Sequence, residues 1–82
     1  MNELDKIAIS TLLRDATGLT IKDYAKKLGI SRKTIYDAIN GGGSSNVRVS
    51  IAKSINVAPS KLWTDNNARI QIIDDLMFAR GL

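Results

Sequence analysis

The chain is 82 residues long, which corresponds to one small domain with a modest hydrophobic core. It contains no cysteine and no histidine, which excludes disulfides, thiolate zinc sites and catalysis by either side chain. Its net charge of +4 is uneven: residues 20–64 carry eight basic and two acidic side chains, and both ends are slightly acidic. A basic centre favours a polyanionic partner, although a solvated lysine-rich helix surface gives a similar pattern.

A first helix is predicted over residues 4–17, because apolar side chains recur there at spacings of three and four. Asn2 is suited to cap its start and Gly18 to end it. We interpret this helix as a scaffold that packs behind the segment that follows. Its predicted apolar stripe comprises Leu4, Ile7, Ala8, Thr11, Leu12 and Ala16, widened by Ile9 and Leu13.

Residues 20–40 predict two short helices separated by a tight turn. The hydroxyl of Thr20 can accept a hydrogen bond from an early amide of the first helix, with Asp23 as a weak capping-box partner. Gly29 suits the left-handed residue that ends this helix, and Ser31 is a good N-cap for the second. The buried faces are expected to comprise Tyr24, Ala25 and Leu28 on the first helix, and Ile35, Ala38 and Ile39 on the second.

These features are the physical specification of a helix-turn-helix that reads DNA. Two closely crossing helices need a small residue at their contact, which Ala25 supplies, and a sharp turn, which Gly29 permits. The second helix must also present a polar and basic face to the major groove. The segment resembles the helix-turn-helix of the lambda-repressor-like (XRE-type) family, with Ala25, Gly29, Ile30 and Ile35 at its small, glycine and apolar positions. An ordinary helical hairpin in a small all-α domain is the alternative.

A glycine-rich loop and a fourth helix are predicted next. Residues 41–46 lack the Gly-Lys-Ser/Thr ending of a phosphate loop, and we interpret them as a flexible loop. The fourth helix spans residues 47–55, with Asn46 as its cap and Asn56 in the left-handed conformation at its end. Its buried stripe is expected to contain Val47, Ile51, Ala52 and Ile55.

A fifth short helix is predicted from Pro59, which suits a first helical turn. The sequence SIAKSINVAPSKLW over residues 50–63 resembles the end of Cro-like and Ner-like domains. In that family a leucine and a tryptophan at this place close the core, which implies the same for Leu62 and Trp63. Stacking of Trp63 on a base is the less favoured alternative, because a duplex hides its base faces.

After a polar break at residues 65–67, a last helix is predicted over residues 68–80. The compact domain of the family is complete by this break, so we divide the chain into a DNA-binding domain, 1–64, and a C-terminal apolar helix, 65–82. The helix either packs on the domain's own core or forms a self-association surface. We favour assembly for at least part of it, because a small core has little surface left to cover it. Its apolar side is expected to comprise Ile70, Ile73, Leu76 and Met77.

The resemblance implies an all-α fold, a compact five-helix domain with an additional C-terminal amphipathic helix, and sequence-specific binding of double-stranded DNA. Arg32 is expected to make bidentate contact with guanine, and Asp37 either accepts from a cytosine amine or pairs with Lys33. The predicted base-reading residues are Ser31, Arg32, Lys33, Tyr36, Asp37 and Asn40. The predicted phosphate-binding residues are Thr20, Lys22, Lys26, Lys27, Thr34, Gly43, Ser44 and Arg48.

A lone helix reads only a few base pairs, so we expect a homodimer or cooperative assembly on operator repeats. The favoured role is a phage or prophage Cro-like repressor. The alternatives are an excisionase (a recombination directionality factor) with the same fold, and a protein-interaction module such as an antitoxin.

An enzyme is disfavoured, because the carboxylates are dispersed along the chain. No cofactor, metal, small-molecule ligand or membrane partner is expected. The lack of a signal-like or membrane-spanning apolar stretch favours the bacterial cytoplasm and nucleoid, or the host cytoplasm for a phage protein.

Overall fold

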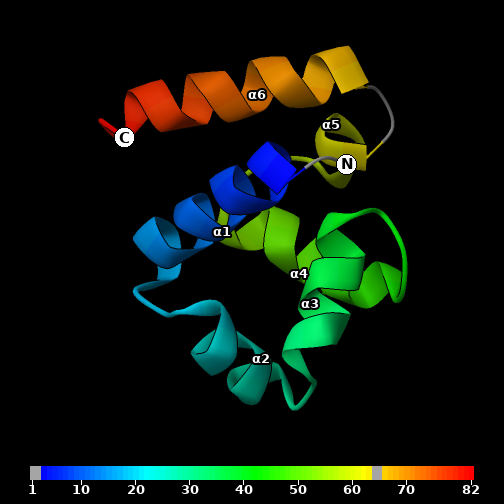
Figure 1. The fold of residues 1–82 in the computed structure, drawn as a ribbon. Helices are drawn as coiled ribbons and strands as arrows, with labels where there is room; N and C mark the ends of the chain where they lie inside the picture. Colours follow the sequence, from blue (N-terminus) through cyan, green and yellow to red (C-terminus); the bar gives the residue numbers. More distant parts are fainter. Residues whose placement is uncertain (1–2, 64–65) are drawn as a thin grey trace.

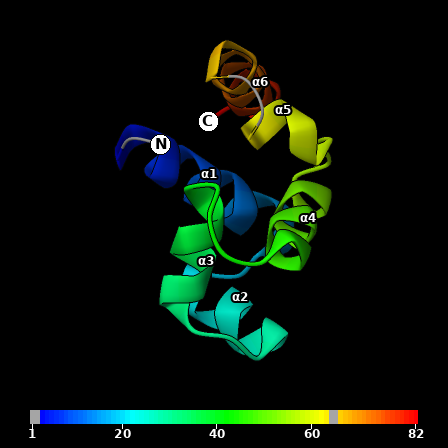
Figure 2. The ribbon, with the colours of Figure 1, turned by 90° about the vertical axis from the view of Figure 1, so that its right-hand side faces the viewer.

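The computed structural model describes the backbone of residues 3–63 and 66–82, and the side chains of residues 6–63 and 67–82. This part of the chain is all α-helical, as predicted, and none of its helices combines the length and apolar character that crossing a membrane requires. α2 and α6 lie at opposite ends of the molecule, with α1 between them (Figure 1, Figure 2). The helices of the described residues are α1 (Glu3–Thr17), α2 (Ile21–Leu28), α3 (Arg32–Ile39), α4 (Ser45–Ser54), α5 (Pro59–Trp63) and α6 (Asn66–Ala79).

α1 lies at the centre of the packing and contacts α2, α3, α4 and α6. Ile9 on this helix is fully buried, whereas Ile7, which was predicted in the buried stripe, is 54% exposed. Residues two apart on a helix point about 200° away from each other, so the burial of Ile9 turns Ile7 outward. The predicted cap Asn2 and the side chain of Leu4 lie outside the described residues.

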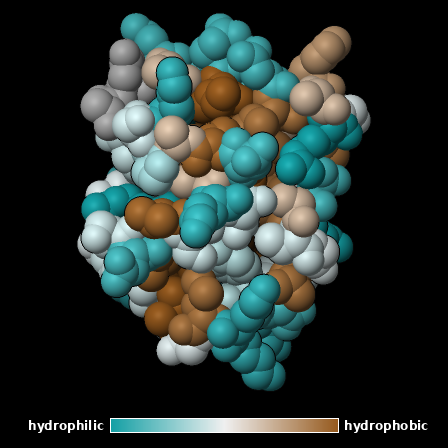
Figure 3. Space-filling model, turned by 180° about the vertical axis from the view of Figure 1, so that it is seen from behind, coloured by the Kyte–Doolittle hydropathy of each residue, from teal (hydrophilic) through white to brown (hydrophobic). Residues whose placement is uncertain are grey.

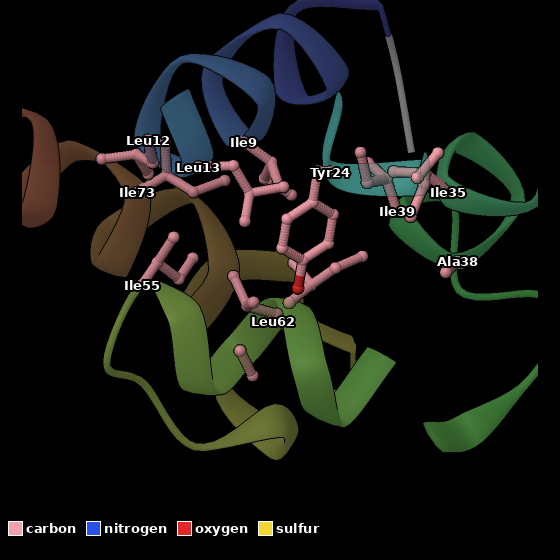
Figure 4. Packing of buried hydrophobic residues seen from close by; sticks show 13 residues of the cluster. Ile9, Leu12, Leu13, Tyr24, Ile35, Ala38, Ile39, Ile55, Leu62 and Ile73 are labelled. Carbon is pink, nitrogen blue, oxygen red and sulfur yellow. The ribbon is translucent and has the colours of Figure 1, made fainter. Parts of the chain in front are cut away.

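Side chains from each of these helices meet in one hydrophobic core, part of which Figure 4 shows from close by. Each fully buried leucine or isoleucine contributes about 1.5–3 kcal/mol by leaving water, so packing rather than intrinsic propensity stabilises such short helices. Leu28, predicted on the buried face of α2, lies instead at its exposed edge. The core comprises Ile9, Leu12, Leu13, Tyr24, Ala25, Ile35, Ala38, Ile39, Ile51, Ala52, Ile55, Leu62 and Ile73.

The start of α4 differs from the prediction. Its N-cap is Ser44, whose Oγ accepts a hydrogen bond of 3.2 Å from the amide of Asn46. Asn46, predicted as the cap, already lies in the first turn, because the extended backbone that an N-cap requires occurs at Ser44. The end of the helix is as predicted: Asn56 adopts a left-handed φ of 63°, and the following Val57 amide bonds back to the carbonyl of Ala52.

α5 begins at Pro59, as predicted, and closes the core with its last two residues. Leu62 is fully buried. Trp63 is half-buried against the core, and its indole N–H donates a hydrogen bond of 3.0 Å to the carbonyl oxygen of Ile39 on α3. The predicted role of both residues is therefore confirmed, and the polar atom of Trp63 is used within the domain.

α6 packs on α1 and α5, and it begins at Asn66 rather than at the predicted Ala68. Ile73 is buried, but Ile70, predicted on the same side, is 50% exposed. Residues three apart on a helix differ by about 60°, so a series with this spacing drifts away from the packed face. Phe78 also points outward and is 88% exposed.

A long-range ion pair holds the end of α6 against α1. The guanidinium of Arg80 lies 2.6 Å from the carboxylate of Asp15, near the end of α1. On the face seen in Figure 3, hydrophobic residues form separate patches between hydrophilic ones. α6 is thus part of the folded unit, and its outward residues lie at the end of the molecule opposite to α2.

Candidate nucleic-acid interface

α2 is set in place by the capping residues that the sequence predicted. Thr20 has an extended backbone, and its Oγ accepts a hydrogen bond of 3.2 Å from the amide of Asp23. This bond uses the backbone amide of Asp23 and is one half of the predicted capping box. The other half would be a hydrogen bond from the Thr20 amide to the Asp23 carboxylate. Gly29 ends the helix with φ of 73°, and the amide of Ile30 bonds to the carbonyl of Ala25 at 3.0 Å.

α3 begins directly after this turn. Ser31 is its N-cap: the Oγ accepts a hydrogen bond of 3.2 Å from the amide of Thr34, and the two hydroxyls lie 2.9 Å apart. The inner face of α3 is fully buried through Ile35 and its neighbours Ala38 and Ile39. The outer face is therefore held in one orientation by the packing of the inner one.

A polar contact that the sequence did not reveal ties α2 to α4. Tyr24 is buried on α2, and its hydroxyl lies 2.7 Å from the Oγ of Ser50 and 3.1 Å from the Oγ of Ser54. The two serines are four residues apart and so share one face of α4. Two hydroxyl residues at this spacing beside the buried stripe of α4 indicate a polar partner. Only the tertiary structure identifies that partner as Tyr24.

Lys33 and Asp37 form an ion pair on the outer face of α3. This is one of the two alternatives predicted for Asp37, the other being a hydrogen bond from a cytosine amine. The Nζ of Lys33 lies 3.0 Å from a carboxylate oxygen of Asp37, one turn further along the helix. The side chains are 83% and 47% exposed, so the pair contributes only about 0.3–0.5 kcal/mol to stability. Its main effect is that the negative charge of Asp37 is balanced on the protein's own surface.

Tyr36 contacts α1 on one side and is partly exposed to solvent. It is half-buried against the core, and the Nζ of Lys6 on α1 lies 4.4 Å from the centre of its ring. This is the geometry of a cation–π contact. Lys6 was absent from the predicted site, because no pattern within residues 20–40 indicates which residue of a preceding helix lies over the ring.

A hollow of about 520 Å³ lies between α1, the start of α2 and the start of α3. It brings together four residues of the predicted interface, Thr20, Lys22, Arg32 and Tyr36, with residues of α1. The basic side chains contributed by α1 are Lys6 and Arg14, both missed by the sequence analysis. The full lining comprises Lys6, Ile7, Ser10, Thr11, Arg14, Thr20, Ile21, Lys22, Arg32 and Tyr36.

The model of the helix-turn-helix family matches residues 12–60, more than half of the chain. The chain belongs to the lambda-repressor-like helix-turn-helix family. This is a family of DNA-binding, non-enzymatic domains. The match begins within α1 and ends within α5, so α6 lies outside it. Searches of curated proteins and of solved structures found no significant match.

The C-terminal end of the second helix of this helix-turn-helix, α3, is held by a structured loop. Gly41 and Gly43 adopt positive φ angles of 89° and 63°. The Nη1 of Arg48 lies 2.7 Å from the carbonyl oxygen of Gly42 and 3.3 Å from those of Gly41 and Gly43. The loop that we predicted as flexible is therefore bound around one guanidinium. Arg48 has further N–H donors, so its predicted phosphate contact remains a prediction.

The other predicted contact residues do not line the hollow. Lys26 and Lys27 are exposed on the last turn of α2, and Asn40 is exposed at the end of α3. Ser44 is exposed but already serves as the cap of α4. Among the side chains that the structure describes, no cluster of three or more acidic residues, histidines or cysteines forms a possible metal site.

Proposed function

We propose that the protein is a transcriptional regulator that binds double-stranded DNA sequence-specifically, with α3 in the major groove. The observation that carries this proposal is the division of α3 into a fully buried inner face and an outer face that carries Arg32 and Lys33, with Asn40 exposed at its C-cap. A helix that discriminates bases must be rigid. The N-cap Ser31, the C-cap Asn40 and the buried inner face supply that rigidity. Recognition in helix-turn-helix proteins uses the N-terminal residues of this helix on base edges.

The proposed base contacts follow from position on α3. Arg32, in the first turn, is proposed to donate two hydrogen bonds to guanine, with Ser31 and Lys33 beside it. Tyr36 and Asn40 are proposed to contact a base or the backbone further along the groove. Asp37 is proposed to orient Lys33, because the two side chains are already paired. The backbone contacts are assigned to Thr20, Lys22, Lys26, Lys27, Thr34, Gly43, Ser44 and Arg48.

A selection of binding sites from a random duplex library tests the proposal. We expect enrichment of a short sequence motif, and the enriched duplex should bind at least about a thousandfold more tightly than a scrambled duplex at physiological salt. Equal binding of selected and scrambled duplexes would overturn sequence-specific recognition.

The specific role that we propose is a repressor of the Cro-like type, which acts in the cytoplasm on operator repeats. Footprints on an attachment site rather than on a promoter would favour an excisionase.

Assembly on DNA is proposed to involve α6. One helix contacts few base pairs, so tight binding normally needs two copies. The support is the outward position of Phe78 and Ile70 on a helix that lies at the far end from α2. Sedimentation analysis with and without the selected duplex should show a dimer that Phe78→Ser weakens. The control is Val49→Ser, at an exposed apolar residue of α4. A one-to-one complex on a single half-site contradicts dimeric binding.

A protein-interaction module is the second candidate function, favoured by the exposure of Phe78 on α6. It predicts that a different protein, rather than a second copy of this chain, covers α6. Retention on random DNA at low salt separates the two functions, because a module without DNA affinity passes through such a column.

A further inference from the structure

We propose that Asn40 is a site of spontaneous conversion to aspartate and isoaspartate, and that the C-terminal cap of α3 controls the rate of this reaction. The conversion places a negative charge at the end of α3, where it weakens DNA binding. The modification itself is independent of the proposed function, whereas its effect on DNA rests on that function.

Asn40 is followed by a glycine, and the sequence contains no other Asn-Gly pair. In the reaction the backbone nitrogen of Gly41 loses its proton and bonds to the side-chain carbonyl carbon of Asn40. The C–N bond of the carboxamide breaks, and ammonia leaves. Water then opens the cyclic imide at either carbonyl, which gives aspartate or isoaspartate. Glycine favours this attack, because it has no Cβ to shield its nitrogen or to restrict its backbone.

The folded backbone keeps the two reacting atoms apart. The torsion ψ relates the backbone nitrogens of consecutive residues, so the ψ of 1° at Asn40 eclipses its own nitrogen with that of Gly41. Ring closure requires the Gly41 nitrogen to eclipse the Cβ of Asn40 instead. The Gly41 N–H also donates a hydrogen bond of 2.9 Å to the carbonyl oxygen of Ala38, which retains the proton that must leave. Asn40 therefore reacts only when this cap opens.

The cap is a Schellman motif that α4 reinforces. Gly41 has a left-handed φ of 89°, and the amide of Gly42 donates a hydrogen bond of 2.8 Å to the carbonyl oxygen of Asp37. The Nη1 of Arg48 lies within 3.3 Å of three consecutive carbonyl oxygens of this loop, those of residues 41–43. Loss of these bonds should raise the population of the open cap, so Arg48 is a positioning residue for Asn40.

Conversion changes the charge of a surface that is proposed to face DNA. Asn40 is exposed at the end of α3, and Asp37 lies three residues before it on the same side of the helix. The carboxylate of Asp37 is paired with Lys33, whereas no lysine or arginine lies three or four residues before position 40. The helix dipole also disfavours a negative charge at a C-terminal end.

Peptide mass mapping after prolonged incubation at mildly alkaline pH tests the site. The wild type should convert at Asn40 at least about tenfold more slowly in native buffer than in guanidinium chloride, because cap opening limits the reaction. Asn46 is the internal control: it is exposed, but the branched side chain of Val47 shields the attacking nitrogen, so it should convert more slowly than Asn40 in denaturant. Equal rates at Asn40 in both solutions, or no conversion in denaturant, would overturn the proposal.

Arg48→Ala should speed the conversion of Asn40 in native buffer by about tenfold, because it removes hydrogen bonds from a charged group to the loop. The matched control is Lys53→Ala, at an exposed lysine of the same helix, which should convert at the wild-type rate. All three proteins should convert equally fast in denaturant. Circular dichroism verifies that each variant is folded. A wild-type rate in folded Arg48→Ala would overturn the role of the loop.

DNA binding separates the effect of the modification from the proposed function. Converted wild type and Asn40→Asp should each bind random duplexes roughly threefold more weakly than fresh wild type. Asn40→Gln cyclises far more slowly and should lose no affinity relative to its own starting value during the same incubation. Unchanged affinity of the converted protein and of Asn40→Asp would overturn the effect on DNA. If fresh wild type binds no DNA, the proposed function fails, while the conversion rates still decide the site.

Discussion

The indole N–H of Trp63 donates a hydrogen bond of 3.0 Å to the carbonyl oxygen of Ile39, the last residue of α3. Ile39 is fully buried, and helix ends leave their last carbonyls without partners inside the helix. The side chain of α5 thus satisfies a buried acceptor at the end of α3. This bond links the residue that closes the core to the C-terminal end of α3.

Replacing Trp63 by phenylalanine should therefore destabilise the domain beyond the loss of ring area. The Ile39 carbonyl would lose its donor, which costs about 1–3 kcal/mol when the group stays buried. Urea unfolding followed by circular dichroism measures the change. A midpoint equal to that of the wild type would show that water or another donor replaces the indole.

Tyr24→Phe should cost about 1 kcal/mol, because it removes the hydroxyl that contacts Ser50 and Ser54 while keeping the buried ring. Tyr36→Phe is the matched control, since the hydroxyl of Tyr36 makes no hydrogen bond among the described residues. Comparison of the two free energies of unfolding checks the prediction. Equal values for both variants would mean that the contact between α2 and α4 contributes nothing to stability.

Arg32→Ala and Lys26→Ala should affect DNA binding in different ways. Loss of the Arg32 guanidinium should cost about 1–3 kcal/mol on the selected duplex and relax the preference at one base pair. Loss of the exposed Lys26 should weaken all duplexes alike and lower the salt slope by about one unit. Fluorescence anisotropy on selected and random duplexes distinguishes these results. The same loss on both duplexes for both variants contradicts the assigned roles.

Asp37→Asn should raise affinity for random DNA, because it removes a negative charge from the reading face and releases Lys33 from its pair. Stability should change by less than about 0.5 kcal/mol, since the Lys33 side chain is largely exposed and the Asp37 side chain is about half exposed. The control is Asp74→Asn on the outer face of α6. If Asp37→Asn instead weakens binding to the selected duplex alone, the prediction is wrong, and Asp37 accepts a hydrogen bond from a cytosine amine.

The sequence by itself determined the features that depend on near neighbours. Thr20 and Ser31 as caps, Gly29 as the left-handed end of α2 and Asn56 at the end of α4 were all predicted correctly. Each of these conformations is set by a residue's own backbone preference and by hydrogen bonds to backbone groups three or four positions away. The helix-turn-helix was found because its specification is contained within residues 20–40.

Tertiary structure decided everything that depends on residues far apart in the chain. Helical spacing in α1 left a broad apolar stripe, and only the packing of neighbouring helices buried Ile9 and turned Ile7 outward. The placement of Lys6 over Tyr36 depends on the packing of α1 against α3, which local patterns do not encode. The same packing brings Arg14 to the hollow beside Arg32. The helix-turn-helix was therefore visible in the sequence, whereas the basic surface beside it exists only in the fold.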